Sequence, residues 1–333
     1  MNRAAERERK PIFLVVPPEA RGCRLDRFLV SALATLDDAP SRGELQRWIE
    51  RERVTVDGRP RKASDKLREG ARVMVAPEPP PRSLALAEAG IKFDVLYTDD
   101  FLLIVNKPPG LVVHPSRGHE TGTLVNGLLA RDDFERDPSE DDEDAVSYSR
   151  PGIVHRLDKG TSGVMVVAKT ARVRERLKVQ FQEHTILREY EALCQGDVRA
   201  RTFSTLHGRH PTDRLRFTGK VKEGRHAVTH TRVLERLGGG IATHVACTLE
   251  TGRTHQIRMH LSESGTPILG DPIYGKPPKS DALRTVAGAL GHQALHARLL
   301  GFVHPETGKN VRFEADPPVD FAVALTALRA IPS

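Results

Sequence analysis

The chain has 333 residues, of which 38% are hydrophobic and 29% are charged. Such a chain is long enough for more than one soluble domain with its own core. No apolar run approaches the roughly 20 residues that cross a bilayer, and the charged N-terminus lacks the apolar core of a signal peptide. Three widely spaced cysteines argue against a disulfide framework, so a cytoplasmic location is expected.

The net charge of +7 understates how basic most of the chain is. Residues 131–144 hold nine acidic and two basic side chains, so the remaining residues carry a net charge of +14. A charge of this size attracts polyanions such as nucleic acids, although many basic proteins bind none. The chain divides into a tail (1–20), a small N-terminal α/β module (21–76), a Pro-rich linker (77–90) and a larger domain (91–333).

The N-terminal module begins with two predicted helices. Apolar residues recur at helical spacing over 24–36, which indicates one buried helix face. Ser41 and Glu44 then form a capping-box pattern at the start of a second helix. This second helix is expected to bury Leu45, Trp48 and Ile49.

A small sheet is predicted to complete this module, with strands at 54–56 and 72–75 and a tight turn at Asp57-Gly58. Two helices, a basic edge and a small sheet resemble the RNA-binding module first known from ribosomal small-subunit protein S-four. Basic helix faces are often only solvated, but the order of elements here favours RNA binding. The residues expected to contact RNA are Arg42, Arg47, Arg51, Arg53, Arg61 and Lys62.

The larger domain is predicted to be an α+β domain with a mixed, largely antiparallel sheet, because many short apolar runs alternate with a few helical patterns. Strands are expected at 91–97, 101–106, 111–114, 153–154, 164–168, 190–194 and 244–249. Helices are expected at 123–130, 171–182, 255–264 and 321–330. The acidic run within 131–149 is expected to be a solvated loop inserted before the central motif.

That central motif, residues 153–170, places Asp158 in a polar loop between two apolar runs. Gly160 and Gly163 should give the loop backbone angles that other residues avoid. With Arg156 before it and Lys159 after it, the carboxylate would stay ionised, which suits a nucleophile or a base. A lone Asp in a loop is more often a turn residue, so the argument depends on the whole motif.

The string His-Arg-Leu-Asp-Lys-Gly-Thr-Ser-Gly over 155–163 resembles the signature of the RluA family of RNA pseudouridine synthases, and in particular its RluD-type ribosomal branch. Further segments fall in the family's order: Val-Asn-Lys-Pro-Pro-Gly-Leu-Val-Val-His-Pro (105–115), Arg-Glu-Tyr-Glu-Ala (188–192), Glu-Thr-Gly-Arg-Thr-His-Gln-Ile-Arg-Met-His (250–260), Gly-Asp-Pro-Ile-Tyr-Gly (270–275) and His-Gln-Ala-Leu-His-Ala (292–297).

The resemblance implies a pseudouridine synthase fold that isomerises uridine in RNA without a cofactor or a metal. Asp158 would be the essential carboxylate, and the sequence leaves open whether it attacks the sugar, attacks the ring or takes a proton. Tyr190 would stack on the flipped uracil, and its phenol could assist proton removal from the ring carbon. Arg258 would pair with Asp158. Arg156 would fill the gap left by the extruded nucleotide. The remaining substrate contacts are expected from His155, Thr161 and Arg253.

Large-subunit ribosomal RNA is the expected substrate, because the N-terminal module accompanies the ribosomal branch, and a monomer is expected. The family also modifies transfer RNA, so that substrate stays open, as does a non-catalytic RNA-binding or ribosome-assembly protein. A zinc hydrolase is the weakest alternative. It would use the closely spaced histidines His255 and His260, or His292 and His296, but neither pair encloses the Glu of a zinc-protease helix.

Overall fold

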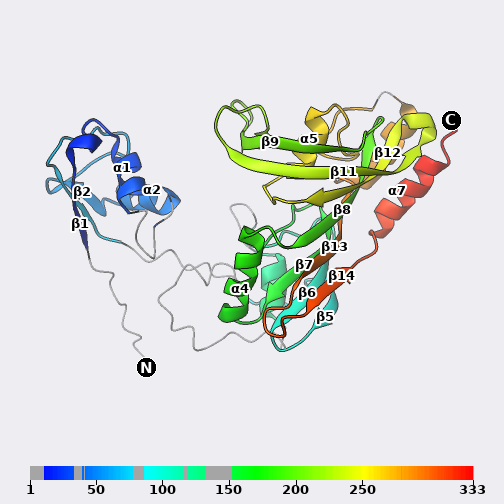
Figure 1. Cartoon of the computed structure of the whole chain (residues 1–333), viewed down its shortest axis with the longest axis horizontal. Coiled ribbons are helices and arrows are strands. Elements are labelled where there is room, and N and C mark those ends of the chain that lie inside the picture. The colour runs from blue at the N-terminus through cyan, green and yellow to red at the C-terminus, as the bar shows by residue number, and fades with distance from the viewer. Residues whose placement is uncertain are drawn as a thin grey trace. The chain divides into compact units, whose positions relative to one another are not determined.

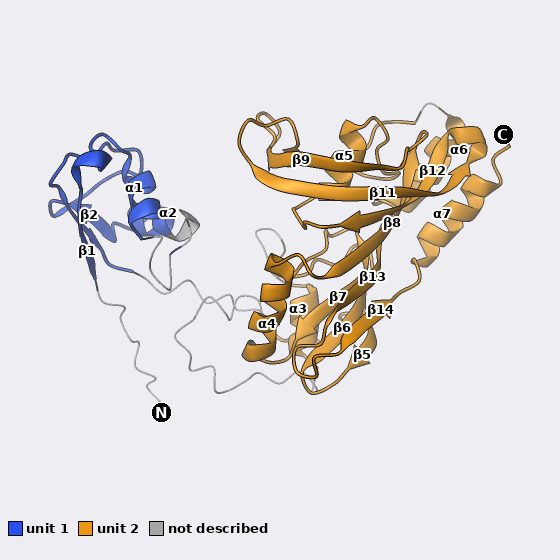
Figure 2. Cartoon of the chain, viewed as in Figure 1, with its two compact units in different colours: residues 1–83, 144–148 blue, residues 84–143, 149–333 orange. Residues whose placement is uncertain are grey.

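The structure of the chain is a computed structural model that describes residues 11–33, 40, 42–77, 86–115, 119, 121–131, 152–278 and 280–332, without the side chains of 42–44 and 171. The chain forms two compact units, residues 1–83 with 144–148 and residues 84–143 with 149–333 (Figure 2). The expected acidic loop beyond residue 131, residues 78–85 of the expected linker and Ser41 of the capping box lie outside the described residues.

The N-terminal unit packs two α-helices on a four-stranded sheet with the order β1-β4-β2-β3 (Figure 1). Its core is built by the apolar positions that the sequence pattern selects, such as Leu29, Leu45 and Trp48. Asp57 and Gly58 both have positive φ, as the predicted tight turn requires. Its elements are β1 (Ile12–Val15), a 3₁₀ turn (Pro18–Ala20), α1 (Leu25–Ala32), α2 (Arg42–Glu50), β2 (Val54–Val56), β3 (Arg59–Pro60) and β4 (Arg72–Val75).

The larger unit is built on one long sheet in which the order β10-β9-β11-β12-β8-β13-β7-β6-β5 is joined by β14 on β13. Only the β13–β7 pair is parallel among the described strands, which confirms the mixed, largely antiparallel prediction. The strands are β5 (Asp94–Thr98), β6 (Leu102–Lys107), β7 (Ser162–Ala168), β8 (Leu187–Gln195), β9 (Arg201–Arg209), β10 (Phe217–Thr218), β11 (Arg225–Leu237), β12 (Ala242–Leu249), β13 (Leu295–Val303) and β14 (Asn310–Glu314).

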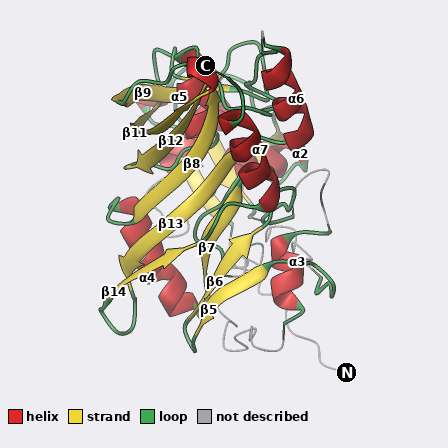
Figure 3. Cartoon of the chain, turned by 90° about the vertical axis from the view of Figure 1, so that its right-hand side faces the viewer, coloured by secondary structure: helices red, strands yellow, loops and turns green. Residues whose placement is uncertain are grey.

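Helices cover both faces of the β5–β7 end of this sheet (Figure 3). Leu124 and Leu128 of α3 share one core with Met165 of β7, while Val173 and Leu177 of α4 belong to the core on the opposite face. A third core lies under the last three helices at the other end. The helices are α3 (Leu124–Leu129), α4 (Ala171–Gln182), α5 (Gln256–Glu263), α6 (Asp281–Leu290) and α7 (Val319–Arg329), with a 3₁₀ turn at Gly238–Gly240.

Two predicted strands are wrong. Residues 111–114 and 153–154 make only isolated bridges, through Val112 and Ile153, because each is a short apolar turn that packs beneath the site. Conversely, β9, β11 and β13 were not predicted. β9 and β11 mix Arg, His and Thr with apolar residues and so lack a continuous apolar run. The helical patterns of α3, α4, α5 and α7 are confirmed within one or two residues at most ends.

Gly163 fixes the point at which β7 leaves the central loop. Its φ is +118°, and a Cβ there would lie 2.2 Å from the backbone oxygen of Ala297 on β13. Gly160 differs from the prediction, since its φ is not positive; a Cβ there would instead meet the side-chain oxygen of Gln293 at 2.5 Å. Both glycines therefore let the loop lie directly against the segment 292–297.

We expect Gly163→Ala to destabilise the larger unit by about 3 kcal/mol or more, because strained φ and a backbone clash act together. Urea unfolding followed by circular dichroism measures the free energy of unfolding. Gly288→Ala is the matched control, since a Cβ in that α6 position meets nothing within 4 Å and should add ~0.5–1 kcal/mol of stability. Equal midpoints for the two variants would contradict the close approach.

Candidate active site

The central loop is held from below by a buried lysine. Lys107, the last residue of β6, is fully buried, and its Nζ donates to the carbonyl oxygens of Pro108 (2.8 Å), Leu111 (2.9 Å) and Lys159 (3.2 Å). Burial lowers the pKa of Lys107 to about 7, although the negative charge of Asp158 acts in the other direction. The turn at 108–111 and the loop that carries Asp158 are thus joined through one side chain.

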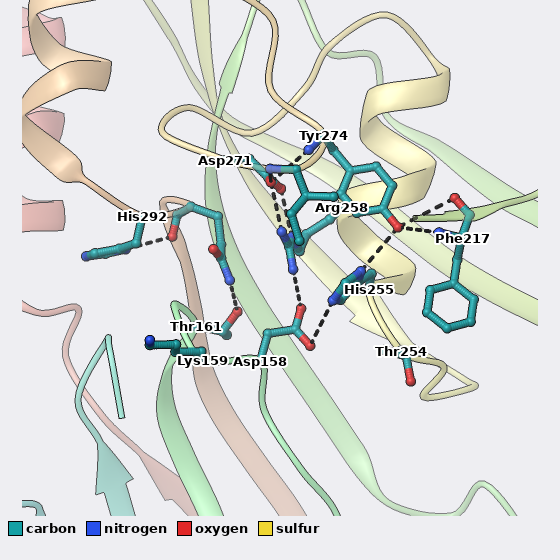
Figure 4. A network of polar contacts seen from close by, with 12 residues as sticks. Asp158, Lys159, Thr161, Phe217, Thr254, His255, Arg258, Asp271, Tyr274 and His292 are labelled. Atoms are coloured by element: carbon teal, nitrogen blue, oxygen red, sulfur yellow. Dashed lines mark hydrogen bonds and ion pairs between the residues drawn. The ribbon is translucent and has the colours of Figure 1, made fainter. Parts of the chain in front are cut away.

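The other end of the loop is held by β13 and the residues just before it. The side-chain amide of Gln293 donates to Thr161 Oγ1 at 3.0 Å, and Ser162 Oγ contacts His296 Nδ1 at 2.9 Å. Within the loop, the backbone N–H of Thr161 donates to the carbonyl of Asp158. These contacts leave the Asp158 carboxylate pointing away from the sheet, toward α5 (Figure 4).

Arg258 of α5 meets that carboxylate. Its Nη1 donates to Asp158 Oδ2 at 2.9 Å, while its Nε and Nη2 donate to the two oxygens of Asp271 at 2.7 and 2.8 Å (Figure 4). Two carboxylates raise the pKa of Arg258 despite the opposing effect of burial, so the guanidinium is permanently charged. Burial alone would raise the pKa of Asp271, but the hydrogen bonds from Arg258 lower it overall.

His255 approaches Asp158 from the start of the same helix. Its backbone is left-handed (φ +59°), an uncommon conformation for a residue with a side chain. Its Nε2 lies 3.9 Å from Asp158 Oδ1, and its Nδ1 contacts the Tyr274 hydroxyl at 3.2 Å. Burial is the main cause that lowers the pKa of His255, so the imidazole is neutral at neutral pH.

These groups line one small pocket that has both charged and apolar side chains. The pocket brings together six of the seven predicted catalytic and substrate-binding residues of this domain, and adds apolar walls from Leu249 and Leu295. A charged floor with apolar sides fits a planar, uncharged ring over a carboxylate. The predicted residues in it are Arg156, Asp158, Thr161, Tyr190, Arg253 and Arg258.

Tyr190 lies on β8, partly buried in the wall of this pocket. Burial is the largest cause that raises the pKa of its phenol, and the charge of Asp158 adds to it, against the opposing charge of Arg188. The phenol therefore keeps its proton at neutral pH. Arg156 is exposed at the rim of the same pocket.

His155, which the sequence predicts to contact the substrate, is not among the residues that line this pocket. Its Nε2 accepts a hydrogen bond from the backbone N–H of Val166 at 3.1 Å, and its ring stacks on Phe181 of α4 at 4.7 Å. Burial, followed by the charge of Arg188, lowers the pKa of His155 to about 3. The side chain fastens the start of the motif to β7 and faces away from the pocket lining.

Four residues around the pocket carry no predicted role in an RNA site: Asp271, Tyr274, Gln293 and His255. Asp271 and Tyr274 belong to the segment Gly-Asp-Pro-Ile-Tyr-Gly. Its presence in the same chain as Thr-Gly-Arg-Thr-His-Gln-Ile-Arg is the sequence feature that could have indicated a role for both residues. The histidines of the zinc alternative have other partners in the described part of the chain: His260 contacts Thr205 and Thr229, and His292 contacts Asp320. In the ranges the structure describes, no three metal-binding side chains converge.

The basic residues predicted to bind RNA lie in the N-terminal unit. Arg51, Arg61 and Lys62 are exposed, and Arg47 and Arg53 are partly exposed. Arg42 begins α2, and its side chain lies outside the described residues. Among the described helices, none has the length and apolar character needed to traverse a bilayer.

Comparison with known proteins gives the class that this fold and pocket define. Residues 101–263 match the family model for RNA pseudouridylate synthase, and residues 23–73 match the S4 domain. The solved structure of human RNA Pseudouridylate Synthase Domain Containing 4 superposes with a TM-score of 0.53 at 25% identity, over 72% of this chain and 95% of that one. The α+β pseudouridine synthase fold is thereby confirmed.

Relatives along nearly the whole chain agree. Ribosomal large subunit pseudouridine synthase D of Neisseria meningitidis serogroup A is 43% identical over 330 residues, 98% of this chain and 84% of the relative. The protein of the same name from Pseudomonas aeruginosa is 40% identical over 320 residues, 94% of each chain. The chain belongs to the RNA pseudouridine synthase family and is an isomerase that converts uridine to pseudouridine in RNA. The non-catalytic alternative is therefore wrong.

We expect Asp271→Asn to lower kcat by about 10- to 100-fold, because the lost charge frees Arg258 to rotate away from Asp158. RNA affinity, measured by filter binding, should change little. Single-turnover kinetics at saturating RNA give the rate. Asp320→Asn is the control, since that carboxylate pairs with His292 outside the pocket. An unimpaired rate for Asp271→Asn would show that Arg258 needs no orienting partner.

Because His155 is buried as a neutral imidazole, we expect the folded state to lose stability in acid. Between pH 6.5 and 3 the unfolded chain binds a proton at His155 that the folded chain excludes, so stability present above pH 6.5 is lost as the pH falls. His155→Gln should reduce the slope of unfolding free energy against pH by up to about 1.4 kcal/mol per pH unit in this window. Urea unfolding at pH 7.5, 6 and 5 measures it, with exposed His226→Gln as control. Parallel slopes would contradict the burial of a neutral imidazole.

Proposed function

We propose that this enzyme modifies uridines in large-subunit ribosomal RNA, with Asp158 as the catalytic carboxylate and no cofactor. The observation that carries the proposal is the contact of Asp158 with Arg258 inside a pocket walled by Leu249 and Leu295. The names of the relatives from Neisseria and Pseudomonas support the substrate class. The S4 match at 23–73 supports binding to a structured RNA.

The chemistry requires the base–sugar nitrogen bond to break and a ring carbon to join the sugar. That carbon loses its proton, and the nitrogen released from the sugar gains one. Atoms are neither gained nor lost, so one carboxylate is sufficient. Asp158 would attack the sugar, attack the ring or take the proton, and Arg258 would hold it ionised and oriented in each case. The fixed geometry of Arg258 between two carboxylates supports orientation without reorganisation during the reaction.

The uracil would enter the pocket after leaving its stack. Tyr190 would lie against the face of the uracil. Burial keeps its phenol neutral, which suits stacking better than action as a phenolate base. Arg156, exposed at the rim, would occupy the vacated space in the RNA. Thr161 and Arg253 would make the remaining polar contacts to the nucleotide.

The N-terminal unit would contribute affinity and leave the chemistry to the larger unit. Its exposed residues Arg51, Arg61 and Lys62, with Arg47, Arg53 and Arg42, would contact phosphates, which fix position and carry no direct sequence information. The protein would act as a monomer in the cytoplasm and need no metal, since no proposed step uses one.

Mapping pseudouridine by chemical labelling in cells that lack this protein tests the substrate. Loss of specific modifications from large-subunit RNA is expected. Loss confined to transfer RNA would replace the substrate proposal with the alternative that the family resemblance leaves open.

We expect Asp158→Asn to reduce tritium release from uracil-labelled RNA below detection, at least 10⁴-fold if the carboxylate is the reacting group. Asn keeps the size of the side chain, so RNA affinity should remain within about threefold. Asp99→Asn, on the far end of the sheet where Asp99 pairs with His304, is the control and should leave the rate unaltered. Appreciable turnover by Asp158→Asn would refute the assignment.

A further inference from the structure

One segment of the larger unit is strongly basic and has no role in the site described so far. Residues 199–225, which include β9 and β10, contain eight Lys and Arg residues and two acidic ones. The segment follows the edge of the sheet that borders α5, since β10 lies at the end of the strand order and its partner β9 is next to β11.

Contacts connect this segment to the pocket. Arg253 lines the pocket, and its Nε donates to the carbonyl of His226 on β11. Arg209 at the end of β9 stacks over the ring of Phe217 at 4.4 Å. That ring meets His255 edge-on at 5.8 Å, and His255 is the neighbour of Asp158 (Figure 4).

The cations along this path repel one another. After burial, the largest cause that lowers the pKa of Arg253 is the charge of Arg225. The pKa of His207 is lowered by burial and then by Arg253 and Arg209. Within the described ranges, none of Arg209, Arg225 and Arg253 forms an ion pair with a carboxylate, in contrast to Arg312 and Arg329 elsewhere in the unit. Unpaired, mutually repelling cations beside a nucleotide pocket gain most from a phosphate chain.

The hairpin between β9 and β10 ends in a well-fixed tip that presents one apolar side chain. The turn is closed by hydrogen bonds from the N–H of Arg216 to the carbonyl of Asp213 and from the N–H of His210 to the carbonyl of Arg216. Leu215 donates its backbone N–H to the Asp213 side chain, and it is 69% exposed. A leucine fixed in this way, between Arg214 and Arg216, is suited to enter a base stack.

We infer that Arg253, Arg225 and Arg209 form a phosphate track for the RNA strand beside the target uridine, and that Leu215 at the hairpin tip wedges into the neighbouring base step. This inference rests on the proposed function, because it assumes that the target base enters the Asp158 pocket. It adds a second RNA-binding surface, in the larger unit, to the one proposed for the N-terminal unit. The wedge would keep the strand open while the uracil occupies the pocket.

The track is tested by the salt dependence of RNA binding with the full chain. Log affinity for an RNA stem-loop with one target uridine is measured against log KCl from 50 to 200 mM. The double variant Arg209→Gln/Arg225→Gln should flatten the slope by roughly 1.4 to 1.8, since each phosphate contact contributes about 0.7 to 0.9. The control Arg312→Gln/Arg329→Gln removes two exposed arginines that are paired with carboxylates and should keep the slope of the parent protein.

The wedge is tested by comparing two RNAs that contain the same uridine, one in a stem-loop and one unstructured. Leu215→Ala should raise KM for the stem-loop about tenfold and change KM for the unstructured strand less than twofold. Leu96→Ala is the matched control, because Leu96 is also exposed but lies on β5, at the opposite end of the sheet. A 2-aminopurine placed beside the target, in the Asp158→Asn background, should brighten on binding and brighten less with Leu215→Ala.

The outcomes separate this inference from the proposed function. A salt slope equal to that of the parent protein would overturn the track, and equal losses on both RNAs would overturn the wedge, whatever Asp158 does. Turnover by Asp158→Asn would overturn the catalytic assignment. The salt slope of RNA binding and the selectivity for the stem-loop would still test the track and the wedge.

Discussion

One guanidinium organises the site. Arg258 is 3% exposed and joins Asp158, which is 18% exposed, to Asp271, which is fully buried. Arg258 comes from α5, Asp271 from the segment before α6, and Asp158 from the loop before β7, so a single side chain ties together three separate parts of the unit. A buried charge of this kind is tolerable only when it is paired and hydrogen-bonded, and here Asp271 accepts from Nε and Nη2 while Asp158 accepts from Nη1.

The arrangement also explains why the two carboxylates differ. Asp271 accepts backbone N–H groups from Ile273 and Tyr274 besides the two bonds from Arg258, so its oxygens are saturated. Asp158 has one oxygen on Arg258 and the other facing His255 at 3.9 Å, beyond hydrogen-bonding distance. The first carboxylate is an anchor, and the second keeps an oxygen available to a substrate. Lys107 holds the backbone of the Asp158 loop at the Lys159 carbonyl, and Gln293 holds the Thr161 side chain.

The sequence predicted the residues of the site better than it predicted the sheet. Asp158, Tyr190 and Arg258 stand in specific strings, and the structure brings all three to one pocket although they are spread over 100 residues. The string does not show which way the His155 side chain points, and in the structure its ring contacts Val166 and Phe181. Strands such as β9 and β11 escaped prediction because their partners, and hence their buried faces, are set by tertiary pairing and not by local hydrophobicity.

The strands β9 and β11, which local patterns did not reveal, carry Arg209 and Arg225. An Asp–Arg–Asp set leaves the floor with a net negative charge, which alone would repel a nucleic acid. The positive charge at the rim must therefore exceed this negative charge before a phosphate chain can approach. The same cations must not pair with the Asp158 carboxylate. Arg209 on β9, Arg225 on β11 and Arg253 in the turn before α5 would supply these cations in the proposed phosphate track. Attraction for the RNA backbone would then come from this edge of the sheet, and reactivity toward the base from the loop before β7.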